Sequence, residues 1–383
     1  MRVELSKKNW APKVKEELNK LLLDISSTEE KQYVVLDWDN TCVYMDTSEV
    51  FLMQQLEDLN FNVTPSEMKY ILNKGIPKTG YHSSYKTKSG MPINIDMISE
   101  DIVKAYEFLF DNYINEKKLS LKQIHETEEY KEFVAKYYYN YVAVIKTFGA
   151  EIGYEWAKYS MANMKPSEIN AVTSKGLKKH LNIPVKKISL TSSEALQSNT
   201  GVLSISLYEG YRINEEMIEL VNKLREAGAE VYLCSASFQH IVEPAACSTE
   251  YGYNFKPENI FAMRFEEQNG KVLPQYLKDY PKTFENGKVT LIDNFIAPKF
   301  NGRAPIMVAG DSDGDVAMML AYNDTQKVLI VNRLKGGKIG ELSNEAKQGN
   351  NKFLLQGRDE NTGKFVASHN TIAMENAGKE IVS

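Results

Sequence analysis

The sequence predicts an α/β protein in which a mostly parallel sheet is interrupted by a large helical domain. Short apolar runs alternate with amphipathic helical segments near both ends of the chain, and the pattern changes to long helical segments between residues 47 and 210. The 383 residues, with 43% hydrophobic content, suffice for two domains. We therefore expect a sheet-containing core with flanking helices over residues 1–45 and 212–383, and a helical domain over residues 46–211.

The first half of the chain predicts one strand and several helices. Residues from about 11 to 24 follow an amphipathic helical pattern, and the apolar run Tyr33–Leu36 predicts a buried strand. Within the helical domain we expect one helix through residues 102–113 and another over about residues 128–148. Gly149 should end the second helix, because glycine is the usual residue just after a helix C-terminus.

The α/β pattern returns after the helical domain. Apolar residues three and four positions apart predict a helix that ends at Gly228. Asn269-Gly270 is a turn signal that predicts a hairpin, and a second hairpin is expected to join residues 353–355 to 365–367. The expected buried strands of this part are the runs 230–235, 306–309 and 327–331.

Composition and charge exclude several classes of protein. The net charge is −5 and no long basic run occurs, so we do not expect binding to nucleic acid. No apolar stretch is long enough to span a membrane, and the first ten residues lack the apolar centre of a secretion signal. Cys42, Cys234 and Cys247 are too few for a disulfide framework and lack zinc-site spacing. We expect a cytoplasmic protein without membrane insertion.

Polar residues stand at the ends of three predicted strands. The carboxyl ends of parallel strands meet at one edge of a sheet, where proteins of this class bind their ligands. We therefore expect these residues to share one site. They are Asp37 and Asp39 after the first strand, Ser235 at the end of the strand 230–235, Asp311 and Asp315 after the strand 306–309, and Lys288 at the start of a helix.

Four carboxylates that converge on one site require a cation. Two negative charges about 4 Å apart repel each other by about 4 kcal/mol at an effective dielectric constant of ~20. Mg²⁺ prefers oxygen ligands, relieves such repulsion and usually keeps a substrate phosphate among its ligands. A lysine and a serine hydroxyl at the same edge can hold phosphate oxygens. The residue types therefore indicate a Mg²⁺-dependent site for a phosphate group.

Taken in order, these motifs resemble those of the haloacid dehalogenase superfamily. The segment Asp37-Trp38-Asp39-Asn40-Thr41 is similar to its first motif, Ser235 to its second, Lys288 to its third, and Gly310-Asp311 with Asp315 to its fourth. The resemblance covers the residues before about 45 and after about 212. The helical domain falls where this superfamily carries its type-1 caps, so the resemblance implies a Rossmann-like core with a helical cap.

The resemblance implies distinct roles for the two aspartates of the first motif. Asp37 would attack phosphorus and become an aspartyl phosphate. Asp39 would protonate the leaving oxygen and later deprotonate the hydrolytic water. An aspartate at the second position is typical of phosphate-ester phosphatases, whereas dehalogenases and P-type ATPases lack it. Asp39 thus indicates a phosphoric monoester hydrolase.

The remaining motif residues would bind phosphate and metal. By the same resemblance, Ser235 and Lys288 would hold phosphate oxygens, and Asp311 would bind Mg²⁺ together with Asp37 and the backbone carbonyl of Asp39. Asp315 would support Lys288 or a metal-bound water.

Each motif also has a purely structural interpretation. An Asp-x-Asp pair at a strand end often only caps backbone amides, and Ser235 alone would more often be a buried, satisfied hydroxyl. The loop 311–315 does not suit calcium, because its glycine stands at the fourth position and Tyr322 occupies the place where a glutamate is needed. Lys282 and Lys299 could replace Lys288, which we favour because it begins a helix.

The leaving group of the substrate must be recognised by the cap. Aromatic faces near a carboxylate can bind a quaternary ammonium, and Glu49 stands just after the first motif. Glu49 could instead serve only the dipole of its helix, and the tyrosines recur at helical spacing that suits cap packing. The candidate aromatic residues are Tyr137, Tyr138, Tyr139, Tyr141, Tyr154, Trp156 and Tyr159.

Within the superfamily, the motifs and the long cap are most similar to the phosphorylcholine phosphatase branch of the phosphoserine-phosphatase-like group. That resemblance implies hydrolysis of phosphocholine or a related amino-alcohol phosphate. A phosphoserine phosphatase and a phosphotransferase on the same core are alternatives. A non-catalytic protein that binds phosphate esters is an alternative of another class.

Overall fold

The core is a six-stranded parallel sheet covered by helices. The structure is a computed structural model that describes residues 3–374, so residues 1–2 and 375–383 of the expected core lie outside the described part. The strand order is β12-β11-β10-β1-β6-β7, and every neighbouring pair is parallel. The predicted fold class is therefore confirmed. The strands are β1 (Tyr33–Leu36), β6 (Glu230–Phe238), β7 (Ile260–Met263), β10 (Met307–Gly310), β11 (Lys327–Val331) and β12 (Phe353–Gln356).

Successive residues of a strand pack against opposite helical layers. Val34 and Leu36 belong to an apolar cluster with α1 and α8, whereas Tyr33 and Val35 belong to a cluster with α10, α11 and α12. Because both faces of the sheet are buried, the core strands consist mainly of consecutive apolar residues. The helices of the core are α1 (Pro12–Ser27), α8 (Glu215–Ala227), α9 (Gln239–Ala246), α10 (Asn286–Leu291), α11 (Asp313–Leu320) and α12 (Gly337–Lys347).

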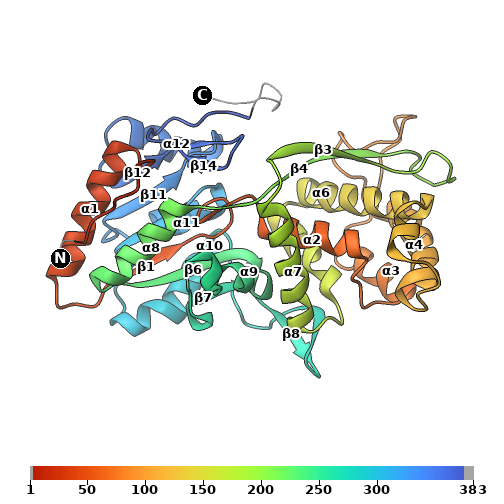
Figure 1. The fold of residues 1–383 in the computed structure, drawn as a ribbon, viewed down its shortest axis with the longest axis horizontal. Helices are drawn as coiled ribbons and strands as arrows, with labels where there is room; N and C mark the ends of the chain where they lie inside the picture. Colours follow the sequence, from red (N-terminus) through yellow and green to blue (C-terminus); the bar gives the residue numbers. More distant parts are fainter. Residues whose placement is uncertain (1–2, 375–383) are drawn as a thin grey trace.

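A second, mainly helical lobe lies beside the core (Figure 1). It has a large apolar cluster that also reaches Phe265 and Val272 of a core hairpin. A long antiparallel hairpin, β3 (Lys186–Thr191) with β4 (Ser204–Glu209), runs along this lobe and was not predicted from the sequence. The helices of the lobe are α2 (Thr47–Asp58), α3 (Pro65–Asn73), α4 (Ile95–Leu109), α5 (Leu121–His125), α6 (Glu128–Ala157) and α7 (Pro166–Leu181).

Two connections hold this cap lobe against the core. The short strands β2 (Val43–Tyr44) and β5 (Arg212–Ile213) pair where the chain leaves and re-enters the core. The hairpin of β8 (Phe265–Gln268) and β9 (Lys271–Tyr276) turns at Asn269-Gly270, as predicted, and both turn residues have positive φ. Its Val272 exchanges backbone hydrogen bonds of 2.9 Å with residues 163 and 164 of the cap. We propose the division at 45/46 and 211/212 as the domain boundary.

Gly149 interrupts α6 instead of ending the helical region. Its φ of 74° and ψ of −174° break the helix, which resumes at once and continues to Ala157. The sequence-based end at residue 148 is therefore correct for the first half of α6 only. The second half, after Gly149, carries Tyr154 and is followed by Lys158, and both side chains reach the pocket described below.

The expected hairpin between residues 353–355 and 365–367 is wrong in its first strand. Residues 353–356 form β12, which pairs in parallel with β11 as the edge of the main sheet. The hairpin instead joins β13 (Arg358–Asp359) to β14 (Lys364–Phe365). The fully buried apolar run of β12 gains more from the sheet than from a surface hairpin.

None of the helices in the described range is both long and apolar enough to cross a membrane. The three cysteines are all free.

Candidate active site

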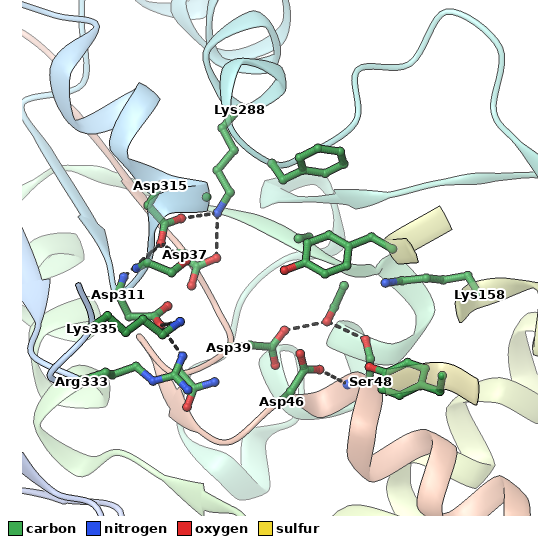
Figure 2. Close-up of a pocket in the computed structure, with 18 residues that line it drawn as sticks. Asp37, Asp39, Asp46, Ser48, Lys158, Lys288, Asp311, Asp315, Arg333 and Lys335 are labelled. Carbon is green, nitrogen blue, oxygen red and sulfur yellow. Dashed lines mark hydrogen bonds and ion pairs between the residues drawn. The ribbon is translucent and has the colours of Figure 1, made fainter. Parts of the chain in front are cut away.

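The carboxyl ends of β1, β6 and β10 surround one pocket. β1 lies between β10 and β6, where the strand order reverses, and sheets of this kind bind ligands at that point. Asp37 directly follows β1, Asp311 directly follows β10, and the backbone N–H of Asp37 donates to the carbonyl of Ala309 at 2.9 Å. Both aspartates line a cavity of about 130 Å³, together with Asp39, Lys288 and Asp315 (Figure 2).

Lys288 neutralises two carboxylates in this pocket. Its Nζ lies 2.7 Å from Oδ1 of Asp37 and 2.6 Å from Oδ1 of Asp315, and all three side chains are buried. Burial alone would lower the pKa of Lys288, but the two carboxylates outweigh burial and hold this pKa well above its usual value. The ammonium is therefore a fixed positive charge beside Asp37.

The other two candidate lysines lie elsewhere. Lys282 forms ion pairs with Glu151 and Glu155 of the cap, at 2.6 and 3.1 Å. Lys299 is exposed and lies over the ring of Tyr232. Of the three lysines that the sequence left open, the structure brings Lys288 to the carboxylates.

Asp37 is held among like charges. Its Oδ2 accepts a hydrogen bond from Oγ1 of Thr41 at 2.9 Å. Burial, followed by the charge of Asp315, raises its pKa well above the usual range, and Lys288 opposes this shift. A further positive charge at this position would stabilise the ionised carboxylate.

Asp315 organises the loop that presents Asp311. Its Oδ2 accepts hydrogen bonds from the backbone N–H groups of Asp311 and Ser312, at 3.0 and 3.2 Å. Gly310 permits this approach, because a Cβ at that position would lie 2.5 Å from the side chain of Asp315. The Gly-Asp-x-x-x-Asp pattern thus builds one rigid loop.

Asp39 is held by hydrogen bonds and not by Lys288. Its Oδ1 accepts from the backbone N–H and Oγ1 of Thr47, at 2.7 and 2.5 Å, and its Oδ2 accepts from Oγ of Ser237 at 2.6 Å. Burial, with the charge of Asp46, raises the pKa of Asp39 to about 7. A carboxyl group with this pKa can both give and take a proton near neutral pH.

Ser235 lies beside the pocket, and its neighbours line the cavity. The Ser235 side chain is fully buried, and its Oγ accepts from the backbone N–H of Ser237 at 3.1 Å. Ala236 and Ser237 contribute to the lining, and Oγ of Ser237 also lies 2.7 Å from Oγ of Ser48. Binding of phosphate by Ser235 stays a prediction, and Ser237 joins it as a pocket hydroxyl.

Asp311 has two basic neighbours that sequence reasoning missed. Nη1 of Arg333 lies 2.5 Å from Oδ2 of Asp311, and Nζ of Lys335 lies 3.7 Å from the same oxygen. The pKa of Asp311 is lowered, because these cations outweigh the effect of its burial. Arg333 and Lys335 follow β11, the strand next to β10, so the rule that located Asp311 could also have located them.

The acidic cluster fits a hard cation. Asp37, Asp311 and Asp315 are buried, and each offers one carboxylate oxygen such that the three oxygens lie within 4.8 Å of one another. All the available donors are oxygens, which Mg²⁺ prefers as ligands. A bound Mg²⁺ would also counter the effect that raises the pKa of Asp37. The carboxylate of Asp39 is outside this group, so the predicted contact through its backbone carbonyl stays a prediction.

The cap lobe closes the other side of the pocket. Of the seven candidate aromatic residues, Tyr141 and Tyr154 line the cavity. The others are buried in the apolar cluster of the cap, where Nε1 of Trp156 donates to the carbonyl of Leu72 at 2.9 Å. Packing therefore accounts for most of the aromatic residues. Lys158, which the sequence did not single out, also lines the pocket (Figure 2).

Glu49 lies in the first turn of α2, close to the pocket but not in its lining. Burial and the charge of Asp46 raise the pKa of Glu49 to about 8. Its charge also raises the pKa values of Tyr138 and Tyr141, whose own burial is the larger cause. Among residues 3–374 its carboxylate forms no ion pair.

Comparison with known proteins identifies the class of the core. Residues 201–320 match the family model described as haloacid dehalogenase-like hydrolase, so the chain carries a haloacid dehalogenase-like hydrolase domain. The matched segment contains Ser235, Lys288, Asp311 and Asp315. The resemblance inferred from the four motifs is confirmed.

Two relatives are similar over different lengths of the chain. A conserved functionally unknown protein from Anaerococcus prevotii, solved as a crystal structure, is 31% identical with a TM-score of 0.92 over 98% of this chain and 100% of that chain, so the two belong to one family. The phosphorylcholine phosphatase of Pseudomonas aeruginosa is 33% identical over an alignment of 130 residues, and the alignment covers 28% of this chain and 36% of that protein.

Proposed function

We propose that this protein is a Mg²⁺-dependent phosphomonoesterase that acts through an aspartyl phosphate on Asp37. The observation that carries the proposal is the pairing of Asp37 with Lys288, 2.7 Å apart and buried, beside Asp39 with a pKa of about 7. Two-step hydrolysis requires a nucleophile held by a cation and a second group that carries a proton at neutral pH. The hydrolase family match supports this assignment.

In the first step, a carboxylate oxygen of Asp37 forms a bond to phosphorus, and the bond from phosphorus to the ester oxygen breaks. Asp39 gives its proton to the departing oxygen, so the alcohol leaves neutral. Lys288 balances negative charge on the phosphoryl oxygens without moving, because Asp315 fixes its ammonium.

In the second step, a water molecule attacks the phosphorus of the aspartyl phosphate. Asp39, now ionised, takes a proton from that water, the bond from Asp37 to phosphorus breaks, and inorganic phosphate leaves. Hydrogen bonds from Thr47 and Ser237 hold the Asp39 carboxylate in both steps. The enzyme returns to its starting state with all protons accounted for.

Asp37, Asp311 and Asp315 are the residues that would hold Mg²⁺ directly or through water. When bound, the ion supplies positive charge that keeps Asp37 ionised and neutralises phosphoryl oxygens. The contacts of Arg333 and Lys335 with Asp311 show that this carboxylate already lies in a positive environment.

For the substrate, we propose an amino-alcohol phosphate such as phosphocholine. The named relative from Pseudomonas aeruginosa supports this class, and so does the carboxylate of Glu49, which forms no ion pair within residues 3–374. An ammonium group near Glu49 would favour its ionised form, which burial and Asp46 oppose. Asp37 and Asp39 are both present, which disfavours a non-catalytic binding protein. A cytoplasmic location stays a prediction.

Removal of divalent metal should abolish turnover. We expect chelator-treated protein to release no phosphate from phosphocholine, phosphoethanolamine, phosphoserine or p-nitrophenyl phosphate, and Mg²⁺ to restore release. Colorimetric phosphate assays across this panel, with product analysis in added alcohol, provide the measurement. Full turnover without metal would contradict the proposal, and a new phosphate ester in place of free phosphate would identify a transferase instead.

Glu49→Gln should selectively lower kcat/KM for substrates with a cationic leaving group. We expect kcat/KM for phosphocholine and phosphoethanolamine to fall about tenfold, because one charge contact is lost, and kcat/KM for p-nitrophenyl phosphate to stay unchanged. Glu57→Gln, at a half-buried position of the same helix where the carboxylate pairs with Lys179, is the control. Equal losses on all three substrates would remove Glu49 from leaving-group recognition.

A further inference from the structure

Arg333 is a cation that is held at a single point beside the acidic cluster. Its Nη1 lies 2.5 Å from Oδ2 of Asp311, and within residues 3–374 its guanidinium makes no other hydrogen bond. The side chain is 26% exposed and lines the pocket next to Asp311 (Figure 2). Most of the N–H donors of this guanidinium therefore remain available to a ligand.

Two other cations near the acidic cluster are held more firmly than Arg333. The side chain of Lys288 is 2% exposed and lies between two carboxylates, at 2.7 and 2.6 Å. Arg358 is equally buried, donates to the carbonyl of Asn40 at 3.0 Å and pairs with Glu360 at 2.6 Å. A single, partly exposed ion pair contributes little to stability, whereas a buried one is costly to break. Of these three cations, Arg333 can change partner at the lowest cost.

The two carboxylate oxygens of Asp311 face different neighbours. Oδ2 faces Arg333 and lies 3.7 Å from Nζ of Lys335, whereas Oδ1 lies 3.3 Å from Oγ1 of Thr41. The same hydroxyl donates to Asp37 at 2.9 Å, so Oδ1 lies on the side of the acidic cluster. A Mg²⁺ ion on Oδ1 and a guanidinium on Oδ2 would be close neighbours with charges of the same sign, which repel each other. Arg333 therefore opposes metal binding at the carboxylate that would hold the metal.

A phosphate group would relieve this conflict. Each carboxylate of the acidic cluster already contacts a cation, so Mg²⁺ alone adds positive charge to a site that is partly neutralised. A phosphoryl group brings the negative charge that compensates the ion. Its oxygens also suit the planar fork of an arginine, which can donate two parallel hydrogen bonds to them.

We propose that Arg333 changes partner from Asp311 to the phosphoryl group, so that Mg²⁺ and phosphate bind cooperatively. Without phosphate, its guanidinium competes with Mg²⁺ for Asp311. With phosphate, it donates to phosphoryl oxygens and leaves Asp311 to the metal. The inference rests on the proposed phosphomonoesterase function and adds a phosphate-binding residue that none of the four sequence motifs contains.

Titrations of the intact protein with Mg²⁺, with and without inorganic phosphate, test this proposal. For the wild type, we expect calorimetry to give a Mg²⁺ Kd that falls at least about tenfold when phosphate is present. Arg333→Met should bind Mg²⁺ about tenfold more tightly than the wild type without phosphate, because the competing charge is gone. The same variant should bind phosphate about tenfold more weakly in the presence of Mg²⁺, because charge-assisted hydrogen bonds are lost.

Two further variants serve as controls. Arg333→Lys keeps the charge but not the planar fork, so its Mg²⁺ Kd should stay near the wild-type value while phosphate binds more weakly. Arg303→Met removes an arginine of similar exposure that also pairs with a carboxylate, that of Glu30. Arg303 precedes β10 and Glu30 precedes β1, so this pair lies at the opposite edge of the sheet. Arg303→Met should leave both dissociation constants unchanged.

The direction of the change in Mg²⁺ affinity separates competition from support. If Arg333 only orients Asp311, Arg333→Met should bind Mg²⁺ more weakly, because loss of a residue that positions a metal ligand lowers metal affinity. Weaker or unchanged Mg²⁺ binding by this variant would overturn the proposal. Wild-type affinity for phosphate in Arg333→Lys would also overturn it, and that variant decides the question if Arg333→Met does not fold.

These binding measurements do not require turnover, so the inference and the proposed function can fail separately. If the wild type hydrolyses p-nitrophenyl phosphate with Mg²⁺ but Arg333→Met binds Mg²⁺ no more tightly, the phosphatase stands and the role of Arg333 is wrong. If both affinities change as expected but no phosphate ester in the panel is hydrolysed, the proposed function fails and the coupled binding of Mg²⁺ and phosphate stands.

Discussion

Asp37→Asn should hydrolyse phosphate esters at a rate lower by about 10⁴-fold or more, while the protein stays folded. The amide cannot form the acyl phosphate, and loss of a catalytic nucleophile typically has effects of this size. The fold should survive because Lys288 keeps its second partner, Asp315, and because the variant removes one of three crowded carboxylates. Steady-state kinetics with p-nitrophenyl phosphate measure the loss of activity, and thermal unfolding measures whether the fold survives.

The control for Asp37→Asn is Asp324→Asn, at an exposed loop position before β11 and remote from the pocket. It should leave both activity and Tm unchanged. Rapid acid quench of the wild type with ³²P-labelled substrate should trap labelled protein, and the Asp37→Asn protein should trap none. Wild-type turnover by Asp37→Asn would refute an aspartyl phosphate at this residue.

Lys288→Met should destabilise the protein by about 3–5 kcal/mol and abolish turnover. The substitution leaves two buried carboxylates without their cation, the situation in which loss of one partner of a buried ion pair is most costly. Urea unfolding gives the free energy, and phosphate release gives the activity. Both effects come from the same ammonium, which lies 2.7 Å from Asp37 and 2.6 Å from Asp315.

Two variants sharpen the Lys288 experiment. Lys299→Met removes a lysine that the sequence also offered for this role and should change stability by less than about 1 kcal/mol, because that side chain is exposed. Adding Asp315→Asn to Lys288→Met should restore part of the lost stability, since one unpaired carboxylate disappears. Unchanged stability in Lys288→Met would show that the ion pairs do not form in solution.

The catalytic end of the sheet was accessible to sequence reasoning for a simple reason. A parallel sheet forces the ends of its strands to one edge, so an apolar run followed by Asp37, and another followed by Asp311, predicts their meeting. Lys288 was found because the sequence places it at the start of a helix near that edge, and α10 begins two residues before it. The loop from Gly310 to Asp315 is local as well, since its hydrogen bonds close within a few residues.

Pocket residues that come from the cap, far in sequence from the strand-end motifs, were harder to predict. Lys158, which directly follows α6, was missed because nothing in the sequence pattern there distinguishes a lysine that faces the pocket from one that faces solvent. Its position depends on the break at Gly149, on the β8–β9 hairpin that holds the cap, and on the ion pairs of Lys282 with the cap. The tyrosine-rich helix suggested a binding surface, but most of those rings pack inside the cap.

The sequence by itself determined the fold class and the acidic edge of the sheet, because strand periodicity and strand-end positions are local properties. The roles of Asp37 as nucleophile and Asp39 as acid stay predictions that the resemblance of the motifs implies. Only the tertiary structure decided which charges remain unpaired within the described residues 3–374. Contacts between distant segments pair Asp37 with Lys288 and Asp311 with Arg333. Burial and the same packing leave Lys158 and Glu49 without an ion pair among the described residues. We propose that recognition of the leaving group depends on these charges, whose positions follow from the packing of the cap against the core.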